Sequence, residues 1–245
     1  MTDDSPARLS VAILAGGLAT RLGPITEKIP KCLVEVAGMP FLEHQFAHLR
    51  ALGLRRVVLC VGHMGEKVLD FAGDGRRFGV EVSYSFDGEV PLGTGGALRQ
   101  ALPLLSDPFI VLYGDSYLPI DFAEVARAFL PSTSVGCMTV FRNENQWDRS
   151  NAWFEDGKLL LYHKRAPDPR MRHIDYGLGL LRHAAFVHAP PAGAFDLAFL
   201  YESLVEAGLL QGQEVRRRFY EIGSPAGLKE LDGFLRRPPS STSLP

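Results

Sequence analysis

The apolar and polar positions in the first half of the chain follow two alternating patterns. Short, nearly continuous apolar runs are typical of strands buried on both faces of a parallel sheet, and one alternating stretch predicts a further strand. Between them, apolar residues spaced three or four positions apart predict amphipathic helices. Strands are therefore expected at residues 9–15, 55–63, 80–85 and 108–115, and helices at residues 40–53, 65–75, 95–105 and 121–130.

The second half of the chain has a more mixed pattern. Strand-like segments occupy residues 134–142, 152–156, 158–164 and 173–182, and helices are expected at residues 195–207 and 225–235. The strand–helix alternation of the first half implies a parallel sheet with helices on both faces. We predict an α/β fold, with a mixed, largely parallel sheet flanked by helices. It forms a single domain over residues 9–236 with a mixed C-terminal lobe, and residues 1–8 and 237–245 are loose tails.

Ligands of such sheets bind at the carboxyl ends of the parallel strands. The motif "LAGG" follows the first predicted strand and "YGDS" follows the fourth. Both motifs therefore fall on the same edge of the predicted sheet, and they mark it as the place to look for a site.

The stretch "VAILAGGLATRLGPITEKIPK" carries two glycines and a few cations after a buried strand. Gly16 and Gly17 let the backbone approach a ligand closely, and their amides can cradle phosphate oxygens. The forked guanidinium of Arg21 can clamp a phosphate, and Lys31 adds a point charge. A plain glycine turn beside solvated cations is the simpler alternative. The GxGxxG fingerprint and the GxxxxGK[ST] loop are both missing from the sequence.

Two further features lie near the same predicted edge. The run Gly93-Thr94-Gly95-Gly96 opens a predicted helix, so its amides are expected to form a site for an anion or for the edge of a base. Asp115 follows Gly114 at the end of a buried strand, where a carboxylate suits a Mg²⁺ ion that a phosphate ligand carries. A capping Thr94 and a turn Asp115 are the structural alternatives.

Composition narrows the class of partner. A net charge of −2 gives no bulk electrostatic attraction for nucleic acid or for an anionic membrane, so phosphate binding must rely on a few placed cations. No apolar stretch approaches the roughly 20 residues of a bilayer span, and the acidic N-terminus lacks the pattern of a signal peptide. Three scattered cysteines predict reduced thiols in a cytoplasmic protein. The histidines form no HExxH motif, so a zinc site is not expected.

Taken together, these motifs resemble the sugar-1-phosphate nucleotidylyltransferase family. The family pattern L-A-G-G-x-G-T-R-L-x-P-x-T followed by P-K matches residues 14–26 and 30–31, with Ala19 in place of the third glycine. "LVEVAGMPFLEHQ", "LGTGGAL" and "YGDS" follow in the family's order, and the resemblance runs from about Val11 to Leu231. It implies a Rossmann-like fold with a nucleotide-binding half at about 9–131 and a sugar-phosphate-binding half at about 132–236.

The resemblance also implies roles for particular residues. Binding of the nucleotide, largely through the backbone, is expected of Leu14, Ala15, Gly16, Gly17, Gly93 and Thr94. Arg21 would bind the triphosphate, and Lys31 would bind the phosphates at the reacting centre. Contact with the sugar phosphate is expected of Lys31 and Lys164, together with Asp175 and Gly177 at a position where the family often has Asn-x-Gly. Asp115 and Glu221 would hold Mg²⁺.

Several residues depart from the family pattern. Ala19 replaces a glycine, Cys32 replaces a common proline, and Glu221 is longer than the usual aspartate. Asp175 in place of asparagine turns a neutral donor into an anion, so its contact with the sugar is an open question. Ala19 is tolerated only if its φ angle is negative, because alanine is strained in the left-handed region.

The implied reaction is in-line attack of a sugar 1-phosphate oxygen on the α-phosphorus of a nucleoside triphosphate, with release of pyrophosphate. It needs no general base, because a phosphate monoester with a second pKa of about 6 is already ionised at neutral pH. Bringing two polyanions together is the difficulty, so cations, Mg²⁺ and positioning are expected to dominate.

The sequence motifs are most similar to those of bacterial heptose 1-phosphate guanylyltransferases, which makes GTP and heptose 1-phosphate the expected substrates. A uridylyl- or cytidylyltransferase acting on another sugar 1-phosphate stays open, as does a non-catalytic nucleotide-binding relative. A glycosyltransferase that consumes nucleotide sugars is less favoured, because Ser116 and Tyr117 follow Asp115 where an Asp-x-Asp would stand. The oligomeric state, a homodimer included, is not readable from the sequence.

Overall fold

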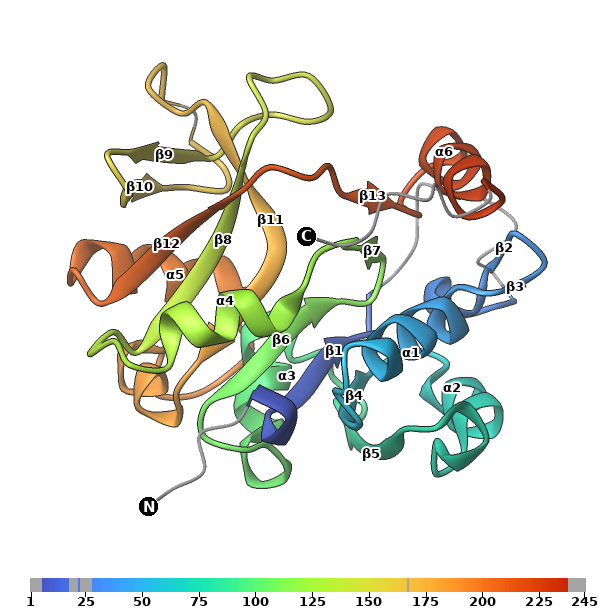
Figure 1. The fold of residues 1–245 in the computed structure, drawn as a ribbon. Helices are drawn as coiled ribbons and strands as arrows, with labels where there is room; N and C mark the ends of the chain where they lie inside the picture. The colour runs from blue at the N-terminus through green and yellow to red at the C-terminus, as the bar shows by residue number, and fades with distance from the viewer. Residues whose placement is uncertain (1–5, 18–21, 23–27, 167, 238–245) are drawn as a thin grey trace.

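A computed structural model describes residues 6–17, 22, 28–166 and 168–237 of the chain. Its centre is a mixed sheet of nine described strands with helices packed on both faces (Figure 1). Four strands run parallel in the order β5 (Glu81–Phe86), β4 (Arg56–Val61), β1 (Ser10–Leu14) and β6 (Phe109–Tyr113). The predicted α/β fold with a largely parallel central sheet is confirmed.

The remaining strands extend the sheet beyond β6. The long strand β11 (His173–Leu181) pairs antiparallel with β6 and also with β8 (Gly136–Arg142), and β8 pairs in parallel with β12 (Leu210–Val215). The hairpin of β9 (Ala152–Glu155) and β10 (Lys158–Tyr162) joins through β9. The two halves of the chain therefore share one sheet.

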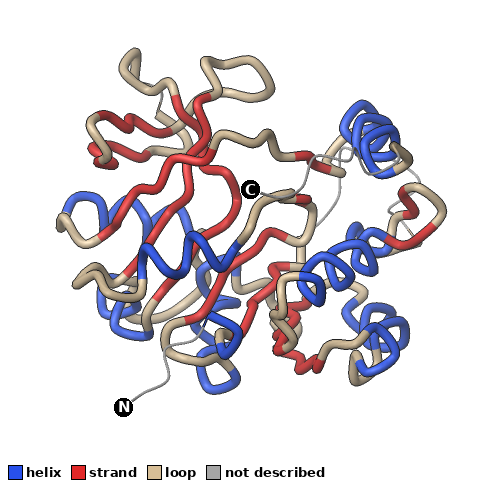
Figure 2. Tube along the Cα trace, in the orientation of Figure 1, coloured by secondary structure: helices blue, strands red, loops and turns tan. Residues whose placement is uncertain are grey.

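Each face of the sheet packs against its own set of helices. Val11 and Ile13 of β1 belong to the core beneath α1 (Phe41–Ala51) and α4 (Phe122–Phe129), whereas Ala12 and Leu14 belong to the core beneath α3 (Gly93–Ala101) and α5 (Leu197–Glu206). The two helix layers lie on opposite sides of the strands in Figure 2. A strand buried on both faces has to be apolar at every position, which is why β1 reads as a continuous apolar run.

The helix ends follow local chemistry. The carboxylates of Asp121 and Asp196 accept hydrogen bonds from the backbone two residues ahead and cap α4 and α5, and Ser224 caps α6 (Pro225–Leu235). The predicted helix 95–105 instead begins at Gly93 and ends at Ala101, followed by the 3-10 turn η5 (Leu102–Leu104). Pro103 lacks the backbone N–H that a continuing α-helix needs.

Smaller elements complete the fold. They are α2 (Gly65–Ala72), the 3-10 turns η1 (Pro6–Arg8), η3 (Lys31–Leu33), η4 (Arg76–Phe78) and η6 (His183–His188), and the short pairs β2 (Glu35–Val36) with β3 (Met39–Pro40) and β7 (Ser116–Tyr117) with β13 (Tyr220–Glu221). A separate apolar cluster of Val36, Phe41, Ile222 and Leu231 fastens α6 to the N-terminal half. Residues 6–8, expected within the N-terminal tail, form η1 beside α4.

The carboxyl ends of β1 and β6 approach each other too closely for a side chain. A Cβ atom on Gly114 would lie 2.6 Å from the carbonyl oxygen of Leu14 and 3.0 Å from the Cα of Ala15. The amide of Gly114 also donates a hydrogen bond of 3.0 Å to that carbonyl of Leu14. Glycine at position 114 therefore sets the distance between the two loops that leave this edge.

We predict that Gly114→Ala lowers the free energy of unfolding by about 1–3 kcal/mol, because the added methyl group forces the two strand ends apart. Gly17→Ala is the matched control: a Cβ at Gly17 meets nothing within 4 Å, so its effect should stay within about 0.5 kcal/mol. Denaturant unfolding of both variants measures the difference. A Gly114→Ala protein as stable as the wild type would contradict the packing described.

Candidate functional site

Several loops meet at the carboxyl edge of the four parallel strands. Leu14, Ala15, Gly16 and Gly17 lead out of β1, and a Cβ on Gly16 would lie 3.0 Å from the amide nitrogen of Gly62, which follows β4. The amide of Ala15 donates to the carbonyl of Cys60. The backbone of the "LAGG" motif is thus held against its neighbour strand at the predicted edge, where close approach of a ligand to the backbone is possible.

Lys31 and Asp115 form an ion pair at this edge. Lys31 begins the turn η3, and its Nζ lies 2.5 Å from Oδ2 of Asp115, which follows β6. Both side chains are largely but not fully covered, with 15% and 31% of their surfaces exposed. The other carboxylate oxygen of Asp115 accepts a hydrogen bond from the Ser116 hydroxyl. Two residues predicted for the reacting centre from distant parts of the sequence are therefore brought into contact.

Gln45, a residue without a predicted role, holds the turn that carries Asp115. Its buried side chain on α1 donates from Nε2 to the carbonyl oxygens of Tyr113 (3.2 Å) and Ser116 (3.1 Å). The two bonds bracket Asp115 and restrict its backbone. The only signal in the sequence was a polar residue on the apolar face of a predicted helix.

Glu221 lies beside Asp115 through a short pair of strands. In β13, Glu221 is opposite Ser116 of β7, and the amide of Ile222 donates to the carbonyl of Asp115 at 2.9 Å. Carboxylates are the ligands that Mg²⁺ takes from proteins, usually one or two of them together with waters and substrate phosphates. The donor set fits that ion. In the described part of the chain, no group of three or more His, Cys, Asp or Glu side chains is placed to hold a metal.

A second cluster joins Thr94 to Lys164 through Asp196. The Nζ atom of Lys164 donates to Oδ2 of Asp196 at 2.7 Å, and the Thr94 hydroxyl donates to Oδ1 at 3.1 Å. Burial raises the pKa of the Asp196 carboxyl, but the hydrogen bonds from Lys164, Ala198 and Thr94 and the charge of Lys164 together outweigh it and hold the pKa below its usual range. Sequence reasoning did not single out Asp196, because its spacing marks only a helix cap.

The first turn of α3 differs from the expectation. The amides of Gly95 and Gly96, expected to be free for an anion, donate instead to the carbonyl oxygen of Phe195 at 2.9 and 3.3 Å. A Cβ on Gly95 would fall 2.2 Å from the Phe195 ring, so glycine is required here for packing against the segment before α5. Only the beginning of the motif, at Gly93 and Thr94, is left for a ligand.

Asp175 and Gly177 lie at a bulge in β11 beside the end of β6. Gly177 has a φ of +95°, and the pairing of β11 with β8 shifts register between Asp175 and Gly179. The Gly177 amide donates to the Asp175 carboxylate at 2.9 Å. Burial raises the pKa of Asp175 to about 6, although this hydrogen bond and the charge of Lys164 act in the opposite direction. A bulge of this kind commonly re-aims a side chain next to a site.

Asp87 is a further carboxylate that sequence reasoning missed. It follows β5, its Oδ2 accepts from the amide of Leu92 at 3.2 Å, and a Cβ on Gly62 would lie 3.3 Å from the same oxygen. Burial raises the pKa of Asp87, which the hydrogen bond from Leu92 partly offsets. Asp87 therefore stands between the Gly16–Gly62 contact and the loop that leads to Gly93.

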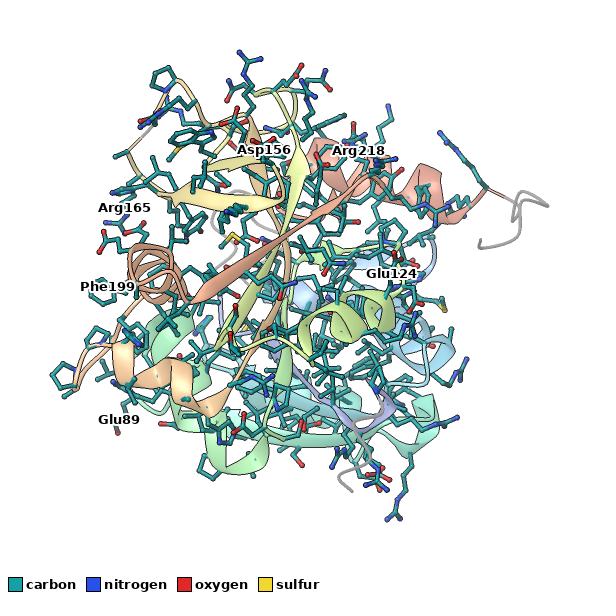
Figure 3. All side chains as sticks on the ribbon, turned by 60° about the vertical axis from the view of Figure 1, so that its left-hand side comes forward. Glu89, Glu124, Asp156, Arg165, Phe199 and Arg218 are labelled. Atoms are coloured by element: carbon teal, nitrogen blue, oxygen red, sulfur yellow. The ribbon has the colours of Figure 1, made fainter. Side chains whose placement is uncertain are left out.

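The predicted residues thus divide into two groups around one edge. Lys31, Asp115 and Glu221 form one group, and Thr94 and Lys164, joined by Asp196, form the other. Figure 3 shows Arg165, the neighbour of Lys164, on the same side of the molecule as Phe199 of α5. Asp175 lies near the second group, because the charge of Lys164 acts to lower its pKa, and it also contacts Tyr113 at the end of β6.

Part of the predicted site lies outside the described residues. Arg21, expected at the triphosphate, and Ala19, whose φ angle was in question, both belong to the undescribed stretch 18–21. The three cysteines are buried and free, and burial raises the pKa of each thiol to about 12. None of the helices described is long and apolar enough to cross a membrane.

Comparisons with known proteins identify the family to which the chain belongs. The model of the nucleotidyl transferase family matches residues 10–150. An N-acetylmuramate α-1-phosphate uridylyltransferase of Neisseria meningitidis is 37% identical over 92% of this chain and 98% of its own length. A D-glycero-α-D-manno-heptose 1-phosphate guanylyltransferase of Campylobacter jejuni is 36% identical over 48% of this chain and 52% of its own.

A crystal structure of HddC from Yersinia pseudotuberculosis complexed with GMP-PN has the same fold, with a TM-score of 0.77 and 23% identity over 93% of this chain and all of that one. The chain spans somewhat less than two thirds of the length of several other curated relatives, which are named as uridylyl- and guanylyltransferases. The family model covers more than half of the chain and a relative is matched along nearly its whole length. The chain therefore belongs to the nucleotidyl transferase family, among enzymes named as sugar-1-phosphate nucleotidylyltransferases.

Proposed function

We propose that this protein transfers a nucleotidyl group from a nucleoside triphosphate to a sugar 1-phosphate and releases pyrophosphate. The observation that carries the proposal is the placement of two lysines, Lys31 beside Asp115 and Lys164 beside Asp196, around one sheet edge that carries the "LAGG" backbone. A reaction between two phosphates needs fixed positive charge on both sides of the reacting phosphorus. Lys31 would serve the triphosphate side, and Lys164 the sugar phosphate.

Asp115 and Glu221 are the residues that would hold a Mg²⁺ ion in this site. When bound, that ion would neutralise phosphate charge and orient the triphosphate. Asp115 is fixed for this task by three independent contacts: the ion pair with Lys31, the bond from Ser116, and the Gln45 bonds around its backbone. The protein's own part of the chemistry is to position the sugar phosphate oxygen in line with the α-phosphorus.

Asp87 supports GTP as the nucleotide. Guanine presents two neighbouring N–H donors on its Watson–Crick edge, which a carboxylate can accept together, whereas uracil presents one donor between two carbonyl oxygens. Asp87 has one oxygen engaged by Leu92, and it lies next to the backbone expected to hold the base. Heptose 1-phosphate is the proposed sugar substrate, because the sequence motifs are most similar to those of bacterial heptose 1-phosphate guanylyltransferases. The Neisseria relative, matched over nearly its whole length, favours UTP with N-acetylmuramate 1-phosphate as the second candidate pair.

A substrate panel tests the proposed activity. We expect pyrophosphate release in the presence of Mg²⁺ from GTP with heptose 1-phosphate, and less from UTP with either heptose or N-acetylmuramate 1-phosphate. Asp87→Asn should lower kcat/KM for GTP roughly 5- to 150-fold, which corresponds to about 1–3 kcal/mol, because one bidentate contact to the base is lost. Glu89→Gln is the matched control, because it removes a carboxylate charge from the exposed loop after β5 and should leave kcat/KM for GTP nearly unchanged.

Two results would contradict these assignments in different ways. Release of pyrophosphate from UTP alone, unaffected by Asp87→Asn, would reject the guanine contact and leave the reaction class intact. Tight nucleotide binding without pyrophosphate release from any pair, with mannose, glucose and N-acetylhexosamine 1-phosphates included, would favour a non-catalytic nucleotide-binding protein.

We further expect Asp115→Asn to lower kcat by about a hundredfold or more while the thermal midpoint stays close to that of the wild type, because asparagine keeps the shape but loses the charge. Removal of divalent ions by a chelator should abolish pyrophosphate release, and added Mg²⁺ should restore it. Glu124→Gln, on an exposed position of α4, is the matched carboxylate control. Retained activity of Asp115→Asn would reject Asp115 as a metal ligand.

The raised pKa of Asp175 predicts a dependence of stability on pH. The folded state binds this proton more tightly than the unfolded chain, so Asp175 contributes stability at about pH 4 that is lost as the pH rises through about 6. Asp175→Asn resembles the protonated acid and does not titrate. Its free energy of unfolding should therefore rise relative to that of the wild type between about pH 4 and pH 8, by at most about 3 kcal/mol. Denaturant unfolding of both proteins at about pH 4 and at about pH 8 measures this gain, and equal differences at the two pH values would contradict the raised pKa of Asp175.

A further inference from the structure

Asp196 holds more partners than a helix cap requires. Its Oδ1 accepts from the amide of Ala198 at 3.0 Å, which is the capping bond of α5. The same oxygen accepts from the Thr94 hydroxyl at 3.1 Å, and Oδ2 lies 2.7 Å from Nζ of Lys164. One carboxylate therefore touches a residue of the expected nucleotide loop and the lysine expected to bind the sugar phosphate.

The Thr94 hydroxyl is committed to this contact. It donates to Asp196, and it accepts from the amide of Leu197 at 2.8 Å. Its hydrogen and one of its lone pairs are thereby used by the start of α5. The Thr94 hydroxyl therefore has no hydrogen left to donate to a nucleotide, and one lone pair and the backbone of Thr94 remain.

The segment before Asp196 is locked to the start of α3 as well. A Cβ on Gly93 would lie 2.6 Å from the carbonyl oxygen of Phe195, and the Gly95 amide donates to that oxygen. Arg99 of α3 donates to the carbonyls of Pro190 and Gly193 at 2.6 Å each, and its guanidinium lies 5.1 Å from the centre of the Phe195 ring. A shift of the nucleotide loop would therefore move Asp196 with it.

Lys164 needs such an anchor. Its side chain is 46% exposed and follows β10 at a loop, so an isolated ammonium there would sample many rotamers and would lose that freedom on binding a phosphate. An ammonium has three donors, so it can keep Asp196 and still bind a phosphate oxygen. Asp196 reduces the number of positions that Lys164 occupies before the substrate arrives.

We propose that Asp196 is a positioning residue that couples the two substrate sites, because the carboxylate that places the Lys164 ammonium is itself placed by Thr94 of the nucleotide loop. This inference rests on the proposed function, in which Lys164 receives the sugar phosphate. Substitution of Thr94, in the nucleotide loop, should therefore affect the sugar phosphate more than the nucleotide.

Asp196→Asn separates the cap from the ion pair. Asparagine is as good an N-cap as aspartate and still offers an oxygen to Ala198 and Thr94, so α5 should remain intact. We expect KM for the sugar 1-phosphate to rise about three- to tenfold, a modest effect because the ion pair is partly exposed, with KM for the triphosphate nearly unchanged. Glu202→Gln is the matched control, since Glu202 also lies on α5 but accepts from the Lys164 backbone amide.

Thr94 tests the link to the nucleotide loop. Thr94→Val should raise KM for the sugar 1-phosphate, and Thr94→Ser, which keeps the hydroxyl, should restore it. In a Lys164→Ala background, Asp196→Asn should have no further effect on that KM, because residues that act through one another are not additive. A full additional loss in the double variant, or a Thr94→Val effect confined to the triphosphate, would overturn the coupling.

A readout without turnover separates this inference from the proposed function. After reductive ¹³C-methylation, the resonance absent from Lys164→Ala reports the Lys164 amine. Asp196→Asn and Thr94→Val should both shift it, whereas Glu202→Gln should leave it nearly in place. A resonance unmoved by Asp196→Asn would overturn the anchor even in an active enzyme. A wild-type protein that releases no pyrophosphate would reject the proposed function, while the resonance would still decide whether Asp196 and Thr94 place Lys164.

Discussion

The close parallel pairing of β1 and β6 is the constraint on which the site depends. Gly114 allows the backbone after β6 to lie against the carbonyl of Leu14, so the "LAGG" loop and Asp115 leave the sheet side by side. Every other part of the site is built onto that edge. Gln45 of α1 holds the turn from one face, and the bulge at Gly177 in β11 lies against Tyr113 from the neighbouring strand. A sheet edge made of backbone is rigid, which is what in-line transfer between two phosphates requires.

The charges at this edge are arranged in pairs. Lys31 is placed by Asp115 and Lys164 by Asp196, so each of these ammonium groups has a carboxylate partner before a substrate binds. Such pairing is consistent with a net charge of −2 for the whole chain, because under the proposed function affinity for phosphate would come from placed cations and not from an overall positive field. It also limits the reorganisation needed when a polyanionic ligand binds.

The elements of the fold were largely predictable, and the exceptions have physical reasons. The sequence predicted the strands β1, β4 and β6, because a strand buried on both faces needs a continuous apolar run. It also predicted the cap at Asp121, because a helix N-terminus favours a short polar side chain at that position. The strand β12, with the sequence "LQGQEV", was missed because half-exposed polar residues show no alternation. Its pairing with β8 makes it a strand. The amides of Gly95 and Gly96 were expected to be free, and no local signal revealed that Phe195, a hundred residues away, occupies them.

By itself, the sequence determined the α/β class and the family resemblance, and it predicted roles for Lys31, Asp115, Thr94 and Lys164 in binding substrates or metal. Those conclusions follow from residue types and short spacings, which are properties of the chain alone. Only the tertiary structure decided which of these residues meet. The contact of Lys31 with Asp115 joins positions 84 residues apart, and Asp196 joins Thr94 to Lys164 across 102 and 32 residues. Contacts between distant residues are set by the register and order of the strands, and a linear pattern contains no information on that register unless the sheet is already known.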